Sequence, residues 1–178
     1  MTIRIRVHER CNEAFRPKTV KIGDQVWMAE NLSVDDGGDG IKTRNGYTFY
    51  DWDAAKRVSE NIPGWHLPSM AEFQELVDSA GGRLAAGSAL KSVDGWPRDV
   101  SNPSAAGTDK FGFNAQPTGF MDSNGFLNLP NKATEYWSSD LYEDRRAYAL
   151  SLGYTTSIIT PSNTYGVYGY LPVRLIKD

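Results

Sequence analysis

The stretch GWHLPSMAEFQEL, residues 64–76, predicts a turn followed by an amphipathic helix. Ser69 stands three residues before Glu72, the spacing at which a serine and a glutamate each accept a hydrogen bond from the other's backbone N–H at a helix start. The apolar face of this helix consists of Phe73, Leu76 and Val77. Gly81-Gly82 then ends the helix, because glycine adopts the left-handed C-terminal conformation at little steric cost.

Three further elements are predicted upstream of this helix. Residues 51–61 contain good helix formers, which predicts a second helix that ends before Pro63-Gly64. The apolar positions of this second helix are Trp52, Ala55 and Val58. Residues 19–28 form two short strand-like runs around Gly23-Asp24, which predicts a hairpin, and the alternating residues 2–7 predict an edge strand.

The second half of the chain has the pattern of strands and loops. After Arg83 helical periodicity disappears, and Gly, Pro, Asn and Ser separate short apolar runs. The segment 122–125 predicts a hairpin turn. Strands are expected at Tyr136–Ser139, Ala147–Leu152, Thr155–Thr160 and Val173–Ile176. The prediction is an α+β fold with two helices and small antiparallel sheets, in a single domain over residues 1–178.

Composition excludes several classes of protein. With 178 residues, 40% of them hydrophobic and 23% charged, the chain suits one self-folding domain. The net charge of −3 and the absence of a Lys/Arg cluster argue against a nucleic-acid partner. No apolar run approaches a membrane span, so we expect no membrane insertion. The first thirty residues contain no apolar signal-peptide core, so the sequence predicts a soluble product without assigning its localisation, and display on a cell or virus surface is the alternative.

Five segments together resemble the Fibrobacter major paralogous domain family. They are TVKIGDQVWMAENL (19–32), GWHLPSMAEFQEL (64–76), GTDKFGF (107–113), YWSS (136–139) and VRLIKD (173–178). Such domains are similar to C-type lectins in fold, so the resemblance implies a C-type-lectin-like fold in which the N- and C-terminal strands pair. The chain departs from the family at Leu175, where a cysteine is usual, and it lacks the paired cysteines and leader of many members. The resemblance therefore does not imply surface anchoring here.

We expect no catalytic residue, no metal site and no cofactor. His66 lies just before a helix without a Ser or Cys nucleophile motif, so it is predicted to fix the turn. A catalytic role would require His66 to be exposed beside a carboxylate in one cleft. His8 and His66 have no metal-binding spacing, and the single cysteine, Cys11, excludes both a disulfide and the cysteine pair of the formylglycine-generating branch of the fold.

Two parts of the sequence are compared with known calcium-binding patterns. The segment 35–40 is rich in Asp and Gly but lacks the EF-hand spacing and its final Glu, so an acidic loop is predicted, with a cation site as the alternative. Calcium-binding lectins use Glu-Pro-Asn or Gln-Pro-Asp and Trp-Asn-Asp tripeptides. The nearest equivalents, at 116–118 and 137–139, lack the required carboxylates and amides, so calcium-dependent sugar binding is not expected.

The C-terminal segment has an unusual composition. Residues 144–176 contain no Lys, Glu, Gln, Met or Trp, although these five types make up 28 of the 178 residues. Codons that end in a pyrimidine cannot encode any of these five. Within a lectin-like fold, this pattern resembles the variable proteins of diversity-generating retroelements, in which randomised adenines of Asn-type codons yield Tyr, Ser, Thr, Asn, Gly, Ile and Val.

Nine residues of this segment form the predicted ligand-binding site. They are Tyr154, Thr156, Ile158, Thr160, Ser162, Asn163, Tyr165, Tyr168 and Tyr170. Tyrosine gives rigid amphipathic contact area and Ser, Thr and Asn give adaptable hydrogen bonds, as in antibody paratopes. The sequence thus predicts a non-enzymatic binding protein with a protein or cell-surface ligand. Two alternatives are a fixed, cell-surface or secreted glycan- or matrix-binding domain of the same fold, and a Tyr/Thr-rich hairpin with no special role.

Overall fold

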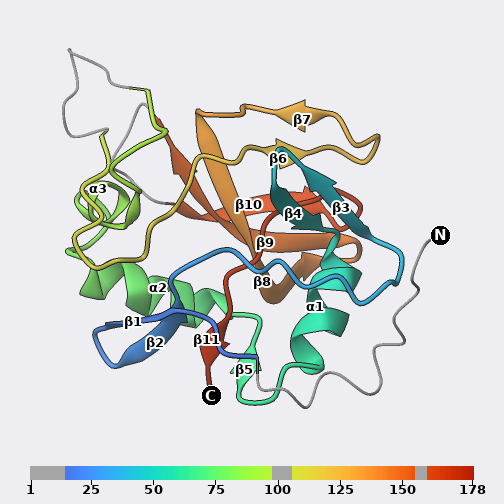
Figure 1. The fold of residues 1–178 in the computed structure, drawn as a ribbon, viewed down its shortest axis with the longest axis horizontal. Coiled ribbons are helices and arrows are strands. Elements are labelled where there is room, and N and C mark those ends of the chain that lie inside the picture. Colours follow the sequence, from blue (N-terminus) through green and yellow to red (C-terminus); the bar gives the residue numbers. More distant parts are fainter. Residues whose placement is uncertain (1–14, 98–105, 155–159) are drawn as a thin grey trace.

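The computed structural model describes residues 15–97, 106–154 and 160–178, and gives the backbone alone for residues 160–165. Over these residues the chain has a mixed α+β fold with three helices and several small antiparallel sheets (Figure 1). The predicted edge strand at residues 2–7 lies outside the described residues. None of the described helices has the length and apolar character needed to span a membrane.

A four-stranded sheet joins the N-terminal hairpin to the end of the chain. Its order is β1 (Thr19–Ile22), β2 (Gln25–Met28), β11 (Ile176–Lys177) and β5 (Trp65–His66). β1 and β2 form the predicted hairpin, and Ile176 pairs with Trp27 of β2 and with His66 of β5. β11 is shorter than the predicted strand at 173–176, because the oxygens of Val173 and Leu175 bond to backbone N–H groups outside a regular ladder.

Both predicted helices are confirmed, together with their start signals. α1 (Trp52–Glu60) begins after Asp51, whose side chain accepts a hydrogen bond from Ala54 N. α2 (Met70–Ser79) begins with the predicted capping box: Ser69 N donates to Glu72 Oε2 at 2.7 Å, and Glu72 N donates to Ser69 Oγ at 3.3 Å. The local sequence was sufficient to predict where both helices begin, because each cap is completed within four residues of the helix start.

The expectation of only two helices is wrong, because a short third helix, α3 (Ala86–Leu90), follows α2. It has five residues and no side-chain cap, so it gives neither a periodic pattern nor a start signal. Ala86, Ala89 and Leu90 are buried. Since so short a helix is unstable by itself, tertiary packing accounts for its presence.

A three-stranded sheet forms the centre of the molecule, in the order β10–β9–β8. β8 (Ala133–Glu143) and β9 (Arg146–Gly153) contain two predicted strands, 136–139 and 147–152. β10 (Thr160–Gly166) pairs antiparallel with β9 and ends where Gly166 faces Arg146. The strand predicted at 155–160 overlaps β10 only at Thr160, and its other residues lie outside the described part of the chain.

Two small hairpins stand beside this sheet. β3 (Ile41–Arg44) pairs with β4 (Tyr47–Tyr50), and β6 (Phe120–Met121) pairs with β7 (Leu127–Asn128). The predicted turn at 122–125 joins β6 and β7, with Asp122 Oδ1 accepting hydrogen bonds from two backbone N–H groups. Both hairpins bond to the segment after β10, because Tyr50 pairs with Leu171 and Met121 pairs with Tyr170.

β9 is covered by core residues on both faces. Leu150 and Leu152 belong to one buried cluster, together with Trp27, and Ala147 and Ala149 belong to a second cluster, together with Trp137. Four tryptophans that lie within strand, helix or motif patterns of the sequence are buried: Trp27, Trp52, Trp65 and Trp137. Trp96, which the sequence left unassigned, is buried as well. The sheet therefore forms a rigid base for the loops at its ends.

Candidate functional site

The structure describes the side chains of three of the nine predicted site residues: Tyr154, Tyr168 and Tyr170. Four more, Thr160, Ser162, Asn163 and Tyr165, lie on β10, for which the backbone is described. Thr156 and Ile158 lie outside the described residues. The geometry of the site therefore rests on the three tyrosines and the residues around them.

Tyr154 lies at one end of the sheet and packs against the core. Its backbone N–H donates to Lys132 O at 2.8 Å, and its half-buried ring contacts the first core cluster. The ammonium of Lys132 stands 5.9 Å from the ring centroid. Tyr154 thus lies at the end of β9 opposite to Arg146, whereas Tyr168 and Tyr170 follow the end of β10 that pairs with Arg146.

Tyr168 and Tyr170 lie together beside the two hairpins. Tyr168 is 56% exposed. Tyr170 exchanges two backbone hydrogen bonds with Met121 of β6, both 2.9 Å long. The ammonium of Lys42, from β3, stands 4.2 Å from the centroid of the Tyr170 ring, which is the distance of a cation–π contact.

The turn of the β6–β7 hairpin adds a further aromatic residue to this region. Phe126 is 71% exposed. A Cβ atom placed on Gly125 would stand 2.7 Å from Lys42 Nζ, so the turn lies directly against β3. Figure 1 shows the β3–β4 and β6–β7 hairpins side by side. Lys42, Phe126, Tyr168 and Tyr170 are called the aromatic surface below.

The end of β8, just before the β8–β9 turn at residues 144–145, exposes two apolar residues. Leu141 and Tyr142 are each 49% exposed, and the Tyr142 ring meets the Tyr148 ring edge-on at 5.4 Å. Val167 N donates to Arg145 O at 3.0 Å, which ties the turn to the segment that carries Tyr168. The β8–β9 turn is therefore joined by its backbone to the residue before Tyr168.

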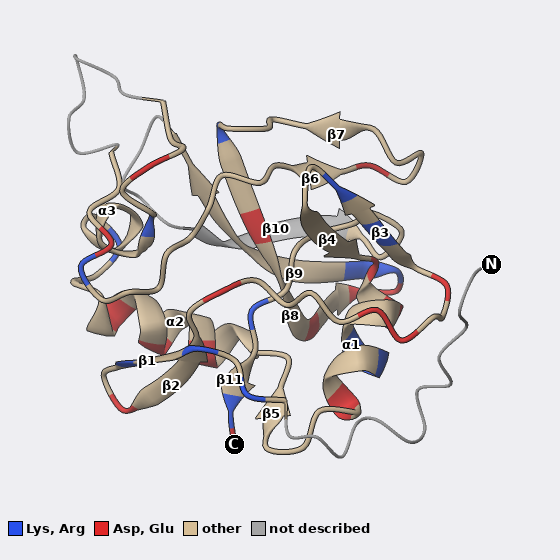
Figure 2. Cartoon of the chain, in the orientation of Figure 1, with Lys and Arg blue, Asp and Glu red and all other residues tan. Residues whose placement is uncertain are grey.

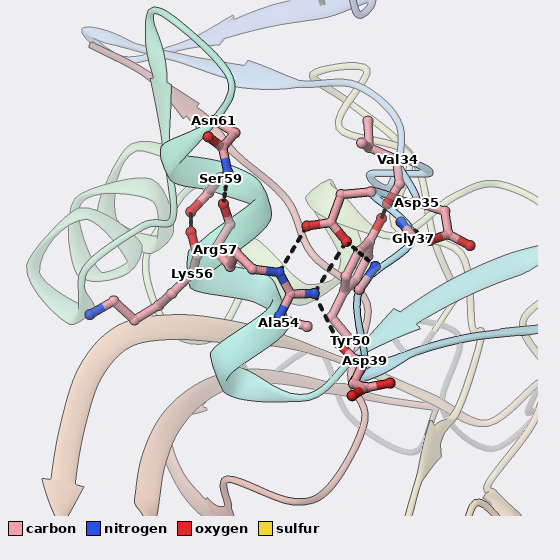
Figure 3. Close-up of polar contacts among 12 residues, drawn as sticks. Val34, Asp35, Gly37, Asp39, Tyr50, Ala54, Lys56, Arg57, Ser59 and Asn61 are labelled. Atoms are coloured by element: carbon pink, nitrogen blue, oxygen red, sulfur yellow. Dashed lines mark hydrogen bonds and ion pairs between the residues drawn. The ribbon is translucent and has the colours of Figure 1, made fainter. Parts of the chain in front are cut away.

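The acidic loop at 35–40 is bound to α1 by an arginine. Arg57 donates to both oxygens of Asp36, from Nε at 2.8 Å and from Nη2 at 3.2 Å, and also to Asp39 O (Figure 3). The Arg57 hydrogen bond is the main reason that the pKa of Asp36 is lowered. The described residues contain no group of three or more His, Cys, Asp or Glu placed to hold a metal ion.

Acidic and basic residues are interspersed over the described part of the chain (Figure 2).

His66 is held between two carboxylates. Its Nδ1 lies 2.7 Å from Asp178 Oδ1, and its Nε2 lies 2.8 Å from Glu72 Oε1. Burial lowers the pKa of His66, but the hydrogen bonds to Asp178 and Glu72 outweigh burial, and the pKa is raised overall. Both ring nitrogens are engaged, and Ser69 Oγ donates to Glu72 at 2.8 Å. The arrangement is consistent with the predicted role of His66 in fixing the turn before α2. The His66 side chain is also 41% exposed beside two carboxylates, so these conditions for a catalytic role are met, whereas the pocket described next is not lined by His66.

A polar pocket that the sequence did not predict lies over Arg174. Its volume is about 260 Å³. It is lined by Glu30, Asn31, Ser33, Tyr47, Asn114, Gln116 and Arg174. Arg174 is only 1% exposed, and burial lowers its pKa. The only local signal for this pocket is the arginine within the VRLIKD segment.

A family model described as the Fibrobacter succinogenes major domain matches residues 20–177. The chain belongs to this family. The resemblance inferred from the five sequence segments is thereby confirmed at the level of the family. Searches among curated proteins and solved structures found no significant match.

The Fibrobacter succinogenes major domain covers both candidate regions of this chain. The match begins within β1 and ends within β11, so it includes the four-stranded sheet that joins the ends of the described chain. All residues of the aromatic surface and of the polar pocket lie inside it. Asp178, which bonds to His66, is the residue directly after the matched range.

Proposed function

We propose that this Fibrobacter succinogenes major domain is a non-enzymatic binding protein that recognises a protein or cell-surface ligand through the aromatic surface. The observation that carries the proposal is the gathering of exposed Phe126 and Tyr168 with the Lys42–Tyr170 pair, from separate hairpins and the segment after β10. Aromatic residues are enriched at protein interfaces because they bury large areas with little loss of side-chain entropy.

The scaffold behind this surface supports the proposal. Tyr50 and Leu171, whose backbones pair between β4 and the segment after β10, are both fully buried. A recognition surface on a packed base loses less entropy on binding than one on a mobile loop. We further propose that this scaffold is a C-type-lectin-like fold, which fits the mixed α+β architecture and the pairing of β11 with the N-terminal hairpin.

We also propose that the C-terminal segment is diversified by a retroelement. Its composition motivates the idea, and the position of β10 is compatible with it. β10 is an edge strand that pairs with β9 alone, so changes along it disturb fewer neighbours than changes in a central strand. The test is the encoding DNA, which should contain a near-copy of the 3′ end of the gene that differs only at adenines, close to a reverse-transcriptase gene. Without such a copy this part of the proposal is withdrawn.

The binding proposal is tested by probing a panel of surface proteins and glycans with the unmodified domain and three variants. Tyr168→Ala and Phe126→Ala are expected to weaken binding by at least about tenfold, which is typical of a central aromatic contact. Val93→Ala is the matched control, because Val93 is 57% exposed but lies after α3, outside the aromatic surface. Equal binding by all three variants and the unmodified chain would exclude the aromatic surface as the binding site.

The alternative function is that of a fixed, cell-surface or secreted glycan- or matrix-binding domain. The exposed ring of Tyr168 favours it, because aromatic rings stack on sugars as well as on protein groups. The same panel separates the two functions, since a glycan binder should bind purified glycans without any protein attached. Tyr168→Phe, which keeps the ring, should then bind nearly as well as the unmodified chain, whereas Tyr168→Ala should not.

A further inference from the structure

We propose that the polar pocket over Arg174 binds the carboxylate of a small hydroxylated ligand, such as a uronic acid. The pocket shares no residue with the aromatic surface, so this inference does not depend on the proposed function. It rests on the partners of Arg174, on one unpaired donor of Asn31, and on the groups at the pocket mouth.

Arg174 is a buried cation without a carboxylate in contact. Its Nε donates to Asn31 Oδ1 at 2.7 Å, and its Nη1 donates to the backbone oxygens of Met28 and Phe113. Its Nη2 donates to Asn114 O at 3.1 Å. No hydrogen bond or ion pair joins it to a carboxylate of the described residues.

The direct hydrogen-bond partners of Arg174 are neutral, and the carboxylates of Asp109 and Glu30 act on its charge without forming an ion pair with it. The guanidinium also faces the rings of Phe113 and Tyr136, at 4.6 Å and 5.5 Å from their centroids. Carbonyl dipoles and ring faces stabilise a buried cation, but an anion does so more strongly in a medium of low polarity. A ligand carboxylate at this pocket would place a negative charge closer to the guanidinium than Asp109 and Glu30 do.

Asn31 adds an unused hydrogen-bond donor to the same pocket. Its Oδ1 accepts from Arg174, so the orientation of the amide is fixed. Its Nδ2 is buried and has no hydrogen-bond partner among the described residues. A buried N–H without an acceptor is costly, and a ligand oxygen would relieve that cost. Asn31 therefore requires an acceptor, and the guanidinium of Arg174 beside it favours a charged one.

The mouth of the pocket indicates what else the ligand carries. The carboxylate of Glu30 forms an exposed ion pair with Lys18, at 2.7 Å, which offsets part of its repulsion of an anion. Ser33, Tyr47 and Gln116 offer hydroxyl and amide groups, which suit ligand hydroxyls. The volume of about 260 Å³ lies below the roughly 300–1,000 Å³ of pockets that hold drug-sized ligands. We therefore expect a smaller ligand, of the size of a single sugar ring.

The ligand class is tested by titrating the full chain separately with D-glucuronate, D-glucose and acetate. Backbone amide NMR shifts report the binding of each compound. Glucuronate and glucose differ in one carboxylate, so glucuronate should bind at least about tenfold more tightly. Acetate, which lacks the hydroxyls, should bind more weakly than glucuronate. Equal binding of glucose and glucuronate, or no shift near Asn31 and Asn114 with any probe, would overturn the proposal. Equal binding of acetate would overturn its sugar component.

Two variants test the site without removing Arg174, whose loss could unfold the chain. Asn31→Asp keeps the acceptor for Arg174 and places a carboxylate beside the guanidinium. It should therefore fold with an unchanged or higher Tm and bind glucuronate at least about tenfold more weakly. Glu30→Gln removes a negative charge at the mouth and should tighten binding by about two- to fivefold. Val93→Ala, outside the pocket, is the control; unchanged binding in Asn31→Asp would overturn the proposal.

Discussion

His66 Nδ1 and Asp178 Oδ1 lie 2.7 Å apart, although the two residues are separated by 112 positions in the chain. The other ring nitrogen of His66 bonds to Glu72, in the capping box of α2. Only a protonated imidazole donates from both nitrogens, so this geometry favours the charged form of His66. The end of the chain is thereby linked to the start of α2 through one titratable group.

The first prediction concerns the pH dependence of this link. Because the pKa of His66 is raised above its ordinary value of 6.5 in the folded chain, its stabilising effect is complete below pH 6.5 and is lost as the pH rises through the raised pKa. Urea unfolding of the unmodified chain and of His66→Gln should differ by about 0.5–1 kcal/mol at pH 6, because the contacts are half exposed. The difference should shrink as the pH rises. A difference independent of pH would contradict the protonated state.

The second prediction concerns the acidic loop. Arg57→Ala should release Asp36 and lower the free energy of unfolding by about 1 kcal/mol or less, since the ion pair is partly exposed. Hydrogen exchange of the Gly38 amide, which donates to Asp36 Oδ1 at 2.9 Å, should become faster. Lys56→Ala is the matched control, because Lys56 lies on the same helix and contacts the Trp52 ring instead. The same exchange rate in both variants would show that Arg57 does not hold the loop.

The third prediction concerns the start of α2. Ser69→Ala removes the acceptor for Glu72 N and the donor to Glu72 Oε2, and should destabilise the chain by about 1–2 kcal/mol. Thermal unfolding measures the change. Ser79→Ala serves as the comparison, because Ser79 is exposed at the last residue of the same helix. Similar losses in the two variants would mean that the capping box contributes little.

The fourth prediction concerns the contact between the β6–β7 turn and Lys42. Gly125 and Gly46 have nearly the same positive φ, +83° and +80°, so alanine should cost about 1 kcal/mol of backbone strain at either position. A Cβ at Gly46 meets nothing within 4 Å, whereas one at Gly125 meets Lys42 Nζ at 2.7 Å. Because the end of a lysine moves easily, stability should fall equally in both variants. Only Gly125→Ala should shift the NMR signals of Tyr170 and weaken ligand binding. An unchanged Tyr170 signal would exclude the contact.

The parts of the fold that the sequence predicts are those with local signals. The capping box at Ser69 and the turn at Gly23 are each complete within a few residues, so pattern alone is sufficient. The sequence did not predict α3, because a helix of only five residues forms through tertiary packing and has no local signal. The β3–β4 hairpin was missed as well, since its strands have four residues each and lack a strict alternation of apolar and polar positions.

The candidate sites likewise contain some residues with a local sequence signal and others that only the folded chain brings to the site. Tyr168 and Tyr170 stand out through the composition of their segment, but Lys42 and Phe126 come from distant hairpins and had no signal of their own. Arg174 bonds to Met28, 146 positions away, and to Asn114, 60 positions away. No local pattern encodes such contacts, so only the folded chain brings the polar pocket together.

The pairing of β11 with β2 and β5 also determines how the molecule can be attached to a support. Figure 1 places the C-terminus at the four-stranded sheet, on the side of the molecule away from the β6–β7 hairpin. A biotin, a fused protein or a bead joined after Asp178 would therefore leave Phe126 facing the solution. Oriented immobilisation through this end should preserve access to ligands that random coupling through lysines, Lys42 among them, would obstruct.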